Sequence, residues 1–192
     1  TENGVVVFNT PGANANAVKE LVVAGLLMST RNLLPAIKKV SNIPDNIDDF
    51  HDHVESIKGE FKGIELSGKS IGIIGLGSIG VSVANTCTEL GMNVFGFDPL
   101  MTVENAWKLS RNVNRIDQID DLVGLSDFIT IHVPLVEKTK GFLGKDLLSK
   151  FPKGSTLLNF SRSEIVDIQA VKNSLEKGIL NYYVSDIPEK DI

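Results

Sequence analysis

The chain has 192 residues, of which 42% are hydrophobic, and it carries a formal net charge of −5 at pH 7. This length is enough for one full domain with a substantial core and for part of a second. The acidic balance disfavours nonspecific binding to nucleic acid and to anionic membrane surfaces, so we expect neither kind of partner.

Residues 1–66 do not have the pattern of an independent domain. They contain one expected strand over 5–8, one helix that starts near Asn14 or Asn16, and a polar connector over 31–66. The helix is apolar on nearly every side, so we expect it to be buried. Two coverings are open: a partner subunit or missing domain, or the domain that follows in the same chain.

The same region argues against membrane and metal binding. Its longest uninterrupted apolar run, residues 21–28, is too short to span a bilayer, and the N-terminus has no basic targeting segment. His51 and His53 are two positions apart on the connector, without a cysteine or a third histidine nearby. We therefore predict no membrane span and no metal site.

A glycine pattern follows the next apolar run and precedes a helical pattern. Gly75, Gly77 and Gly80 form GxGxxG in this setting, which is typical of a dinucleotide-binding turn. The first glycine permits the tight turn, the second lets a pyrophosphate approach the backbone, and the third lets the helix pack closely on the strand. The N–H groups at the start of that helix suit the pyrophosphate charge.

An acidic residue ends the next expected strand. Asp98 lies 23 positions beyond Gly75. This is close to the spacing of about 20 at which dinucleotide-binding domains place the acid that binds the ribose hydroxyls. Its charge repels a 2′-phosphate, and its neighbours Pro99 and Leu100 supply no cation. The sequence therefore favours NAD over NADP as the cofactor.

From residue 67 onward, strand and helix patterns alternate, which is typical of an α/β doubly wound parallel sheet of the Rossmann type. Cys87 falls on the first of these helices as a small buried residue that has no partner for an internal disulfide, so a reducing cytoplasm is the simpler setting. The expected strands are 70–75, 93–97, 112–116, 127–133, 155–160 and 181–186, and the expected helices are 79–90, 118–125, 145–151 and 167–177.

A strand order of 3-2-1-4-5-6 would open the cofactor crevice between the carboxyl ends of the first and fourth strands. His132 stands at the end of the fourth strand. We favour a hydrogen-bonded structural histidine over a pocket-lining group at this position.

Several separated motifs in this order resemble the D-isomer-specific 2-hydroxyacid dehydrogenases. The resemblance covers almost the whole chain and implies a Rossmann domain that binds NAD and belongs to an oxidoreductase. The residues that carry it are 7–18, 20–21, 68–69 with the glycine loop, 91–94, 98–99, 127–135 with Thr139, 159–162 and 165–167.

The resemblance also implies roles for individual residues. It places Asn14 and Arg162 near the substrate, where the guanidinium grips the carboxylate with two hydrogen bonds. Arg162 stands at the carboxyl end of the fifth strand, where ligands bind, which favours this role over that of a surface arginine. The cofactor-binding residues that it implies are Gly75, Gly77, Ser78, Ile79, Gly80, Asp98, Val133, Pro134, Phe160, Ser161, Arg162 and Asp186.

The chain departs from the family pattern at its end and beside Arg162. The family's catalytic histidine lies beyond the point where this sequence stops, and its acidic partner falls at Glu189 or Asp191. Ser163 and Glu164 replace the two glycines that commonly follow the arginine, which makes that backbone less permissive and adds a negative charge.

The resemblance divides the chain into three parts. Residues 1–66 hold a remnant strand of a substrate domain, an interface helix and the connector; residues 67–187 form the NAD-binding domain; residues 188–192 begin the return to the missing portion. We therefore expect an excised domain that binds NADH but turns over substrate negligibly, and that forms a homodimer through the nucleotide-binding domain.

Within the family, residues 9–16 favour 3-phosphoglycerate as the small 2-hydroxy acid substrate, and thus a role in serine biosynthesis. Two alternatives remain open. One is a family enzyme that acts on glycerate, lactate or formate, and the other is a non-catalytic, NAD-responsive dimeric scaffold.

Overall fold

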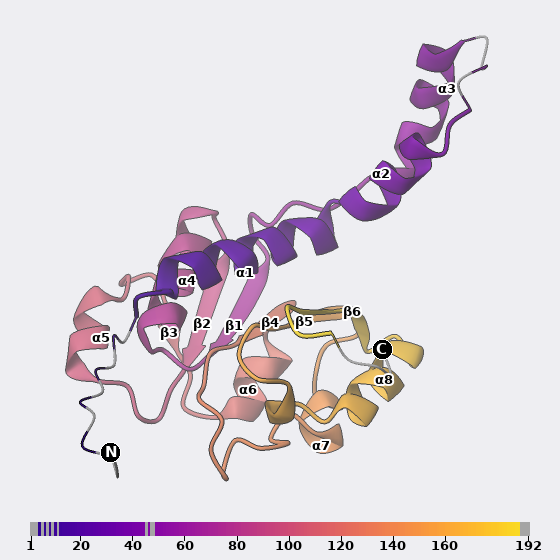
Figure 1. The fold of residues 1–192 in the computed structure, drawn as a ribbon. Coiled ribbons are helices and arrows are strands. Elements are labelled where there is room, and N and C mark those ends of the chain that lie inside the picture. Colours follow the sequence, from indigo (N-terminus) through magenta and orange to yellow (C-terminus); the bar gives the residue numbers. More distant parts are fainter. Residues whose placement is uncertain are drawn as a thin grey trace.

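The computed structural model describes residues 4, 6, 8, 10, 12–44, 46 and 49–188. Its centre is one parallel six-stranded sheet in the order β3-β2-β1-β4-β5-β6 (Figure 1). The predicted doubly wound Rossmann sheet and its strand order are confirmed. The strands are β1 (Ser70–Ile74), β2 (Asn93–Phe97), β3 (Asn114–Arg115), β4 (Phe128–Ile131), β5 (Ser155–Asn159) and β6 (Leu180–Ser185).

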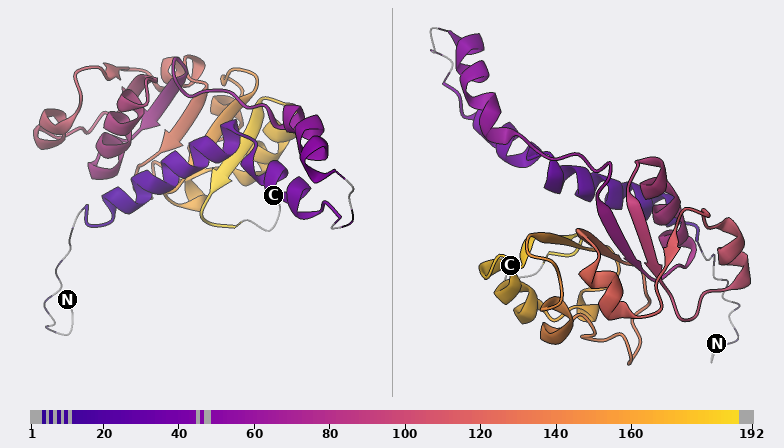
Figure 2. Two further views of the ribbon diagram at one scale, coloured as in Figure 1. Left: turned by 90° about the horizontal axis from the view of Figure 1, so that it is seen from above. Right: turned by 180° about the vertical axis from the view of Figure 1, so that it is seen from behind.

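Helices cover both faces of this sheet (Figures 1 and 2). On one face lie α1 (Ala15–Thr30) and α4 (Ser78–Glu89). On the other lie α6 (Ile119–Gly124), α7 (Lys145–Leu148) and α8 (Ile168–Glu176). The four helices predicted after residue 67 are therefore present: α4 is shifted by one residue from the predicted bounds, and the other three are shorter than predicted.

Successive side chains of a strand point to opposite faces of the sheet, so the strands contribute to two separate apolar cores, one under each helical layer. Ile71 and Ile73 of β1 point into the core below α1 and α4, whereas Ile74 points into the core below α6, α7 and α8. The central strands are thus buried on both faces, which explains their continuous apolar sequences.

Helix α1 packs on its own domain with one face. Val22 and Leu26 are completely buried. A Cβ on Gly25 would lie 3.0 Å from Val184 and 3.2 Å from Leu158, so the missing side chain lets α1 rest closely on β5 and β6. The expected burial holds for this face only, because other apolar side chains of α1 remain exposed.

The predicted polar connector is instead helical. It forms α2 (Leu33–Ser41), α3 (Phe50–Ile57) and the 3-10 turn η1 (Lys58–Phe61), which extend away from the sheet as an arm (Figures 1 and 2). After the arm the chain comes back to the end of α1, since the Ile64 N–H donates to the Thr30 carbonyl at 2.9 Å.

Among the described residues no single helix is long and apolar enough to cross a membrane; α1 and α2 meet that test only as a pair bent by 66°.

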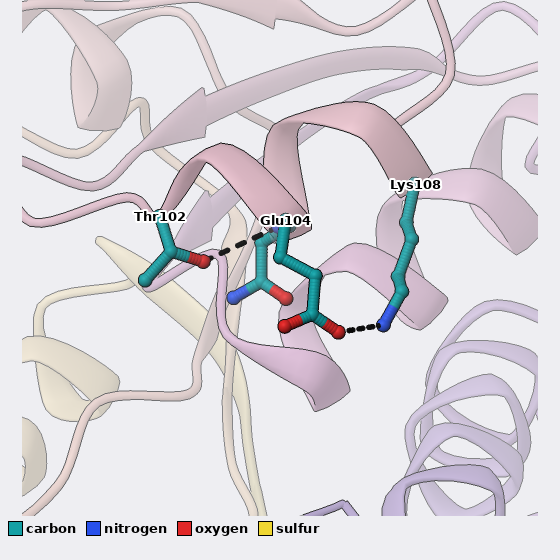
Figure 3. Close-up of polar contacts among 4 residues, drawn as sticks. Thr102, Glu104 and Lys108 are labelled. Carbon is teal, nitrogen blue, oxygen red and sulfur yellow. Dashed lines mark hydrogen bonds and ion pairs between the residues drawn. The ribbon is translucent and has the colours of Figure 1, made fainter.

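A further helix, α5 (Val103–Lys108), was not predicted. It is only six residues long, too short for a hydrophobic period to show in the sequence. Its polar ends hold it: the Thr102 hydroxyl accepts from the Asn105 N–H at 3.2 Å, and Lys108 pairs with Glu104 at 2.6 Å (Figure 3). This exposed pair lowers the pKa of Glu104, through the hydrogen bond first and the charge second.

The strand expected over residues 5–8 is not supported where it is described. Val5 and Val7 lie outside the described residues, and Val6 and Phe8 are exposed and not part of a strand.

Candidate cofactor and active site

The three loop glycines occupy distinct environments after β1. Gly75 has a φ of +92°, and a Cβ there would lie 2.7 Å from the His132 carbonyl oxygen. A Cβ on Gly80 would lie 1.9 Å from the Gly75 carbonyl oxygen, whereas one on Gly77 would meet no atom within 4 Å. The outer glycines are thus required by the turn and the close-packed helix, and Gly77 leaves open space in front of the α4 N-terminus.

Asp98 directly follows β2 and bonds the glycine loop. One carboxylate oxygen accepts from the Leu76 N–H at 2.8 Å, and the other accepts from the Leu100 N–H at 2.8 Å. A carboxylate has about four lone-pair sites, so acceptor capacity remains for ribose hydroxyls. Asp98 therefore orders the loop that it faces, a second function that its sequence position did not reveal.

A cavity of about 650 Å³ opens beside Asp98, between the end of β2 and the segment from α5 to β3. A pocket of this size suits the adenosine part of a dinucleotide. Its apolar lining includes Leu76, Phe97, Pro99, Met101, Ala106, Leu109, Val113 and Ile116, and its charged lining consists of Asp98, Arg111, Arg115 and Asp117.

The end of β4 meets the glycine loop from the neighbouring strand. The His132 N–H donates to the Ile74 carbonyl at 2.7 Å, and the Val133 side chain lies 2.8 Å from a Cβ built on Gly75. Val133 and the exposed Pro134, which the sequence predicts to lie beside the adenine side of the cofactor, therefore follow the strand that borders the loop.

His132 is bonded on one side only. Its Nε2 lies 3.0 Å from the Thr130 hydroxyl, as a structural histidine requires. Its Nδ1 is buried without a hydrogen-bond partner among the described residues. Burial lowers the pKa of His132 to about 4, because desolvation penalises the imidazolium.

Arg162 extends from a hydrogen-bonded turn at the end of β5. The buried Asn159 side chain accepts from the Ser161 N–H at 3.1 Å and donates to the Arg162 carbonyl at 3.0 Å. The Ser161 hydroxyl donates to the Ile131 carbonyl at 2.7 Å, which ties the turn to β4. Sequence reasoning included Asn159 in the family motif but missed that it shapes this turn.

The guanidinium itself is exposed, and its Nη1 donates to the Ser161 carbonyl at 2.8 Å. The residues that replace the family's two glycines begin a 3-10 turn, Ser163–Ile165. Neither has a positive φ, since Asn32 is the one non-glycine residue with a positive φ in the described part of the chain. The less permissive backbone therefore carries no strain.

The remaining predicted residues lie around this edge of the sheet. A Cβ on Gly12 would lie 3.2 Å from the Ser78 side chain, so the loop that carries the exposed Asn14 reaches the start of α4. Phe160 is partly buried against the α1–α4 core, and Asp186 is exposed directly after β6. Glu189 and Asp191 lie outside the described residues.

Comparison with known proteins agrees with this geometry. Residues 26–191 match the family model for the D-isomer specific 2-hydroxyacid dehydrogenase, NAD binding domain. D-3-phosphoglycerate dehydrogenase of Methanocaldococcus jannaschii is 34% identical over 191 residues, which are 100% of this chain and 34% of that protein. D-3-phosphoglycerate dehydrogenase of Bacillus subtilis is 34% identical over 178 residues, 93% of this chain and 31% of that protein.

A solved structure has the same architecture. The NAD-dependent formate dehydrogenase from Staphylococcus aureus in complex with NAD superposes with a TM-score of 0.76 at 29% identity, covering 94% of this chain and 50% of that chain. The present chain spans about a third of the length of the curated relatives it matches. The chain belongs to the D-isomer specific 2-hydroxyacid dehydrogenases, as their NAD-binding domain.

Proposed function

We propose that the whole protein transfers a hydride between NAD and D-3-phosphoglycerate. The observation that carries this is the convergence of the glycine loop, Asp98 and Arg162 at the carboxyl ends of β1, β2 and β5. That edge of a doubly wound sheet is where ligands bind. The two relatives described above support phosphoglycerate, since both are D-3-phosphoglycerate dehydrogenases.

The cofactor fits the residues present. The open space at Gly77 accepts a pyrophosphate against the N–H groups of Ser78 and Ile79, and the Asp98 carboxylate accepts bonds from the ribose. Phe160, Ser161 and Asp186 line the nicotinamide end in this proposal. NAD supplies the acceptor for the hydride.

Arg162 positions the substrate in this scheme. Its guanidinium has five N–H donors, so its bond to the Ser161 carbonyl leaves a donor pair for the substrate carboxylate. Oxidation breaks the C–H bond next to that carboxylate, the hydride leaves to the cofactor, and the hydroxyl proton passes to a base. Holding the carbon against the hydride acceptor is the arginine's contribution. Asn14 approaches the same substrate from the loop before α1.

The base is a residue beyond the described site. His51 and His53 lie on α3 in the arm, and His132 is buried against Thr130 with a lowered pKa. We assign the role to none of them, and place it on a histidine elsewhere in the whole protein, paired with Glu189 or Asp191.

Calorimetric titration of this chain with NADH and then NADPH tests cofactor binding. Saturable NADH binding that far exceeds NADPH binding, with the preference lost in Asp98→Ala, supports the proposal. Binding of neither nucleotide contradicts it. A substrate panel of phosphoglycerate, glycerate and lactate on the whole protein then tests the reaction.

A second substrate assignment has its own support. The formate dehydrogenase described above shares the fold at 29% identity, and Arg162 would hold any small carboxylate equally well. Preferential turnover of formate or lactate by the whole protein would favour this alternative over phosphoglycerate.

We also propose that two copies associate through α1 and α2. These two helices expose seven large apolar side chains, and exposed apolar side chains that gather in one region are typical of protein–protein interfaces. Ile37→Asp should shift the mass measured by light scattering from dimer to monomer, whereas a monomeric parent chain would refute the dimer. The exposed residues are Leu21, Leu27, Met28, Leu33, Leu34, Ile37 and Val40.

The cytoplasm is the proposed location. Cys87 is fully buried, and desolvation raises the pKa of its thiol to about 12. A neutral, enclosed thiol without a partner suits a reducing compartment.

A further inference from the structure

The cavity beside Asp98 contains cations that the sequence neighbours of Asp98 do not supply. Arg111 and Arg115 line it together with Asp98, although both come from the segment after α5. The Arg115 guanidinium is engaged by Asp117, with Nη2 2.7 Å and Nε 2.8 Å from the same carboxylate oxygen. Arg111 forms no ion pair with any residue that the structure describes, so its charge is available to the cavity.

The backbone that carries Arg111 is held in place by α4. The Asn85 side chain accepts from the Ser110 N–H at 2.8 Å and donates to the Lys108 carbonyl at 2.8 Å. Helix α4 begins at the glycine loop, so the wall that bears Arg111 and the pyrophosphate site share one rigid support. The backbone next to Arg111 is thus anchored, and the exposed Arg111 side chain lines the cavity from it.

We infer that Arg111 is a cofactor-specificity residue that opposes Asp98: it pairs with the 2′-phosphate of NADP once the Asp98 charge is removed. This rests on the proposed cofactor site and deepens it. Asp98 excludes the phosphate because two anions would share one edge of the cavity. In this view Asp98 alone makes the site selective for NAD, because Arg111 in the same cavity would attract the 2′-phosphate of NADP.

Removing the carboxylate also frees two backbone donors. The Leu76 and Leu100 N–H groups that now bond Asp98 would point toward the same edge. A 2′-phosphate brings about two negative charges and three acceptor oxygens, and arginine matches its geometry with paired hydrogen bonds. Arg111 and the two N–H groups therefore form a complete anion site in an Asp98→Ser variant.

The test measures the ratio of NADPH to NADH affinity by calorimetry in Asp98→Ser, Arg111→Ala and the double variant. The ratio cancels any loosening of the glycine loop, which affects both nucleotides alike. Asp98→Ser should shift the ratio toward NADPH by about ten- to a hundredfold, the range expected of a charge-assisted bond, and adding Arg111→Ala should remove most of that shift.

Lys108→Ala in the Asp98→Ser background is the matched control. Lys108 is an exposed cation on α5 that pairs with Glu104 and does not line the cavity, so the shift should persist (Figure 3). Asp98→Asn, which removes the charge and keeps one acceptor, provides a second readout if Asp98→Ser folds poorly by circular dichroism.

The outcomes separate the two proposals. If the parent chain binds neither nucleotide, the cofactor site itself fails and this inference falls with it. If NADH binds but Asp98→Ser and Asp98→Asn leave the ratio unchanged, the inference alone is overturned. It is likewise overturned if the double variant keeps the full shift toward NADPH.

Discussion

Acid should destabilise this domain through His132. Its Nδ1 is buried without a hydrogen-bond partner among the described residues, and desolvation lowers its pKa to about 4 in the folded chain. In the unfolded chain the pKa is about 6.5. The unfolded state therefore binds more protons between these two values, so stability present above about pH 6.5 is lost as the pH falls toward 4.

The size of the effect follows from the two pKa values. One pKa unit corresponds to about 1.36 kcal/mol, so the full difference is about 3 kcal/mol. Between pH 8 and pH 5 the linkage relation assigns a loss of about 2 kcal/mol to this histidine. That is a sizeable part of the stability of a domain of this size, about 5–15 kcal/mol.

The assay is urea unfolding of the chain without cofactor at pH 8 and at pH 5, compared with His132→Gln. The variant cannot titrate at this position, and its carboxylates are those of the parent, so the difference between the two pH slopes isolates the histidine. His51→Gln, an exposed histidine on α3, is the control and should keep the parental slope. Equal slopes in His132→Gln and the parent chain would refute the reasoning.

Three further substitutions and one chemical treatment test other parts of the domain. Gly80→Ala should cost about 2 kcal/mol of stability by urea unfolding, because its Cβ would lie 1.9 Å from a carbonyl oxygen, whereas Gly77→Ala should fold normally and weaken NADH binding at least tenfold. Asn159→Ala should lower the free energy of unfolding by about 2 kcal/mol and speed amide hydrogen exchange around Arg162, because both side-chain bonds to this turn are lost. Unchanged exchange there would contradict the role of Asn159 in holding the turn. Cys87 should resist iodoacetamide at pH 8 until urea unfolds the chain, because burial raises its pKa to about 12, and rapid labelling of the folded chain would show the helix to be open.

The elements that the sequence predicted well are those with a local physical signature. Strands β1 and β4 are buried on both faces, so each appears as a largely apolar run, and Leu157 and Leu158 form the buried apolar centre of β5. The glycine loop was recognisable because each outer glycine meets a backbone oxygen that a side chain would strike. The strand order followed from the alternation of strands and helices, which permits few topologies.

The elements that were missed have a short or masked signature. Helix α5 is held by a cap and one ion pair rather than by an apolar stripe. Helices α2 and α3 do have apolar residues at helical spacing, but these lie in a segment of polar composition that was interpreted as a connector. The structure shows that this segment is helical.

The sequence by itself determined the fold class, the cofactor loop and the family, because these depend on residue types at fixed spacing along the chain. Only the tertiary structure decided which groups surround the loop. Arg111 lines the cavity beside Asp98, and the Asn159 side chain holds the Arg162 turn by a hydrogen bond. The physical reason is that charge and hydrogen bonding act through space: residues far apart in the chain meet where parallel strands end together.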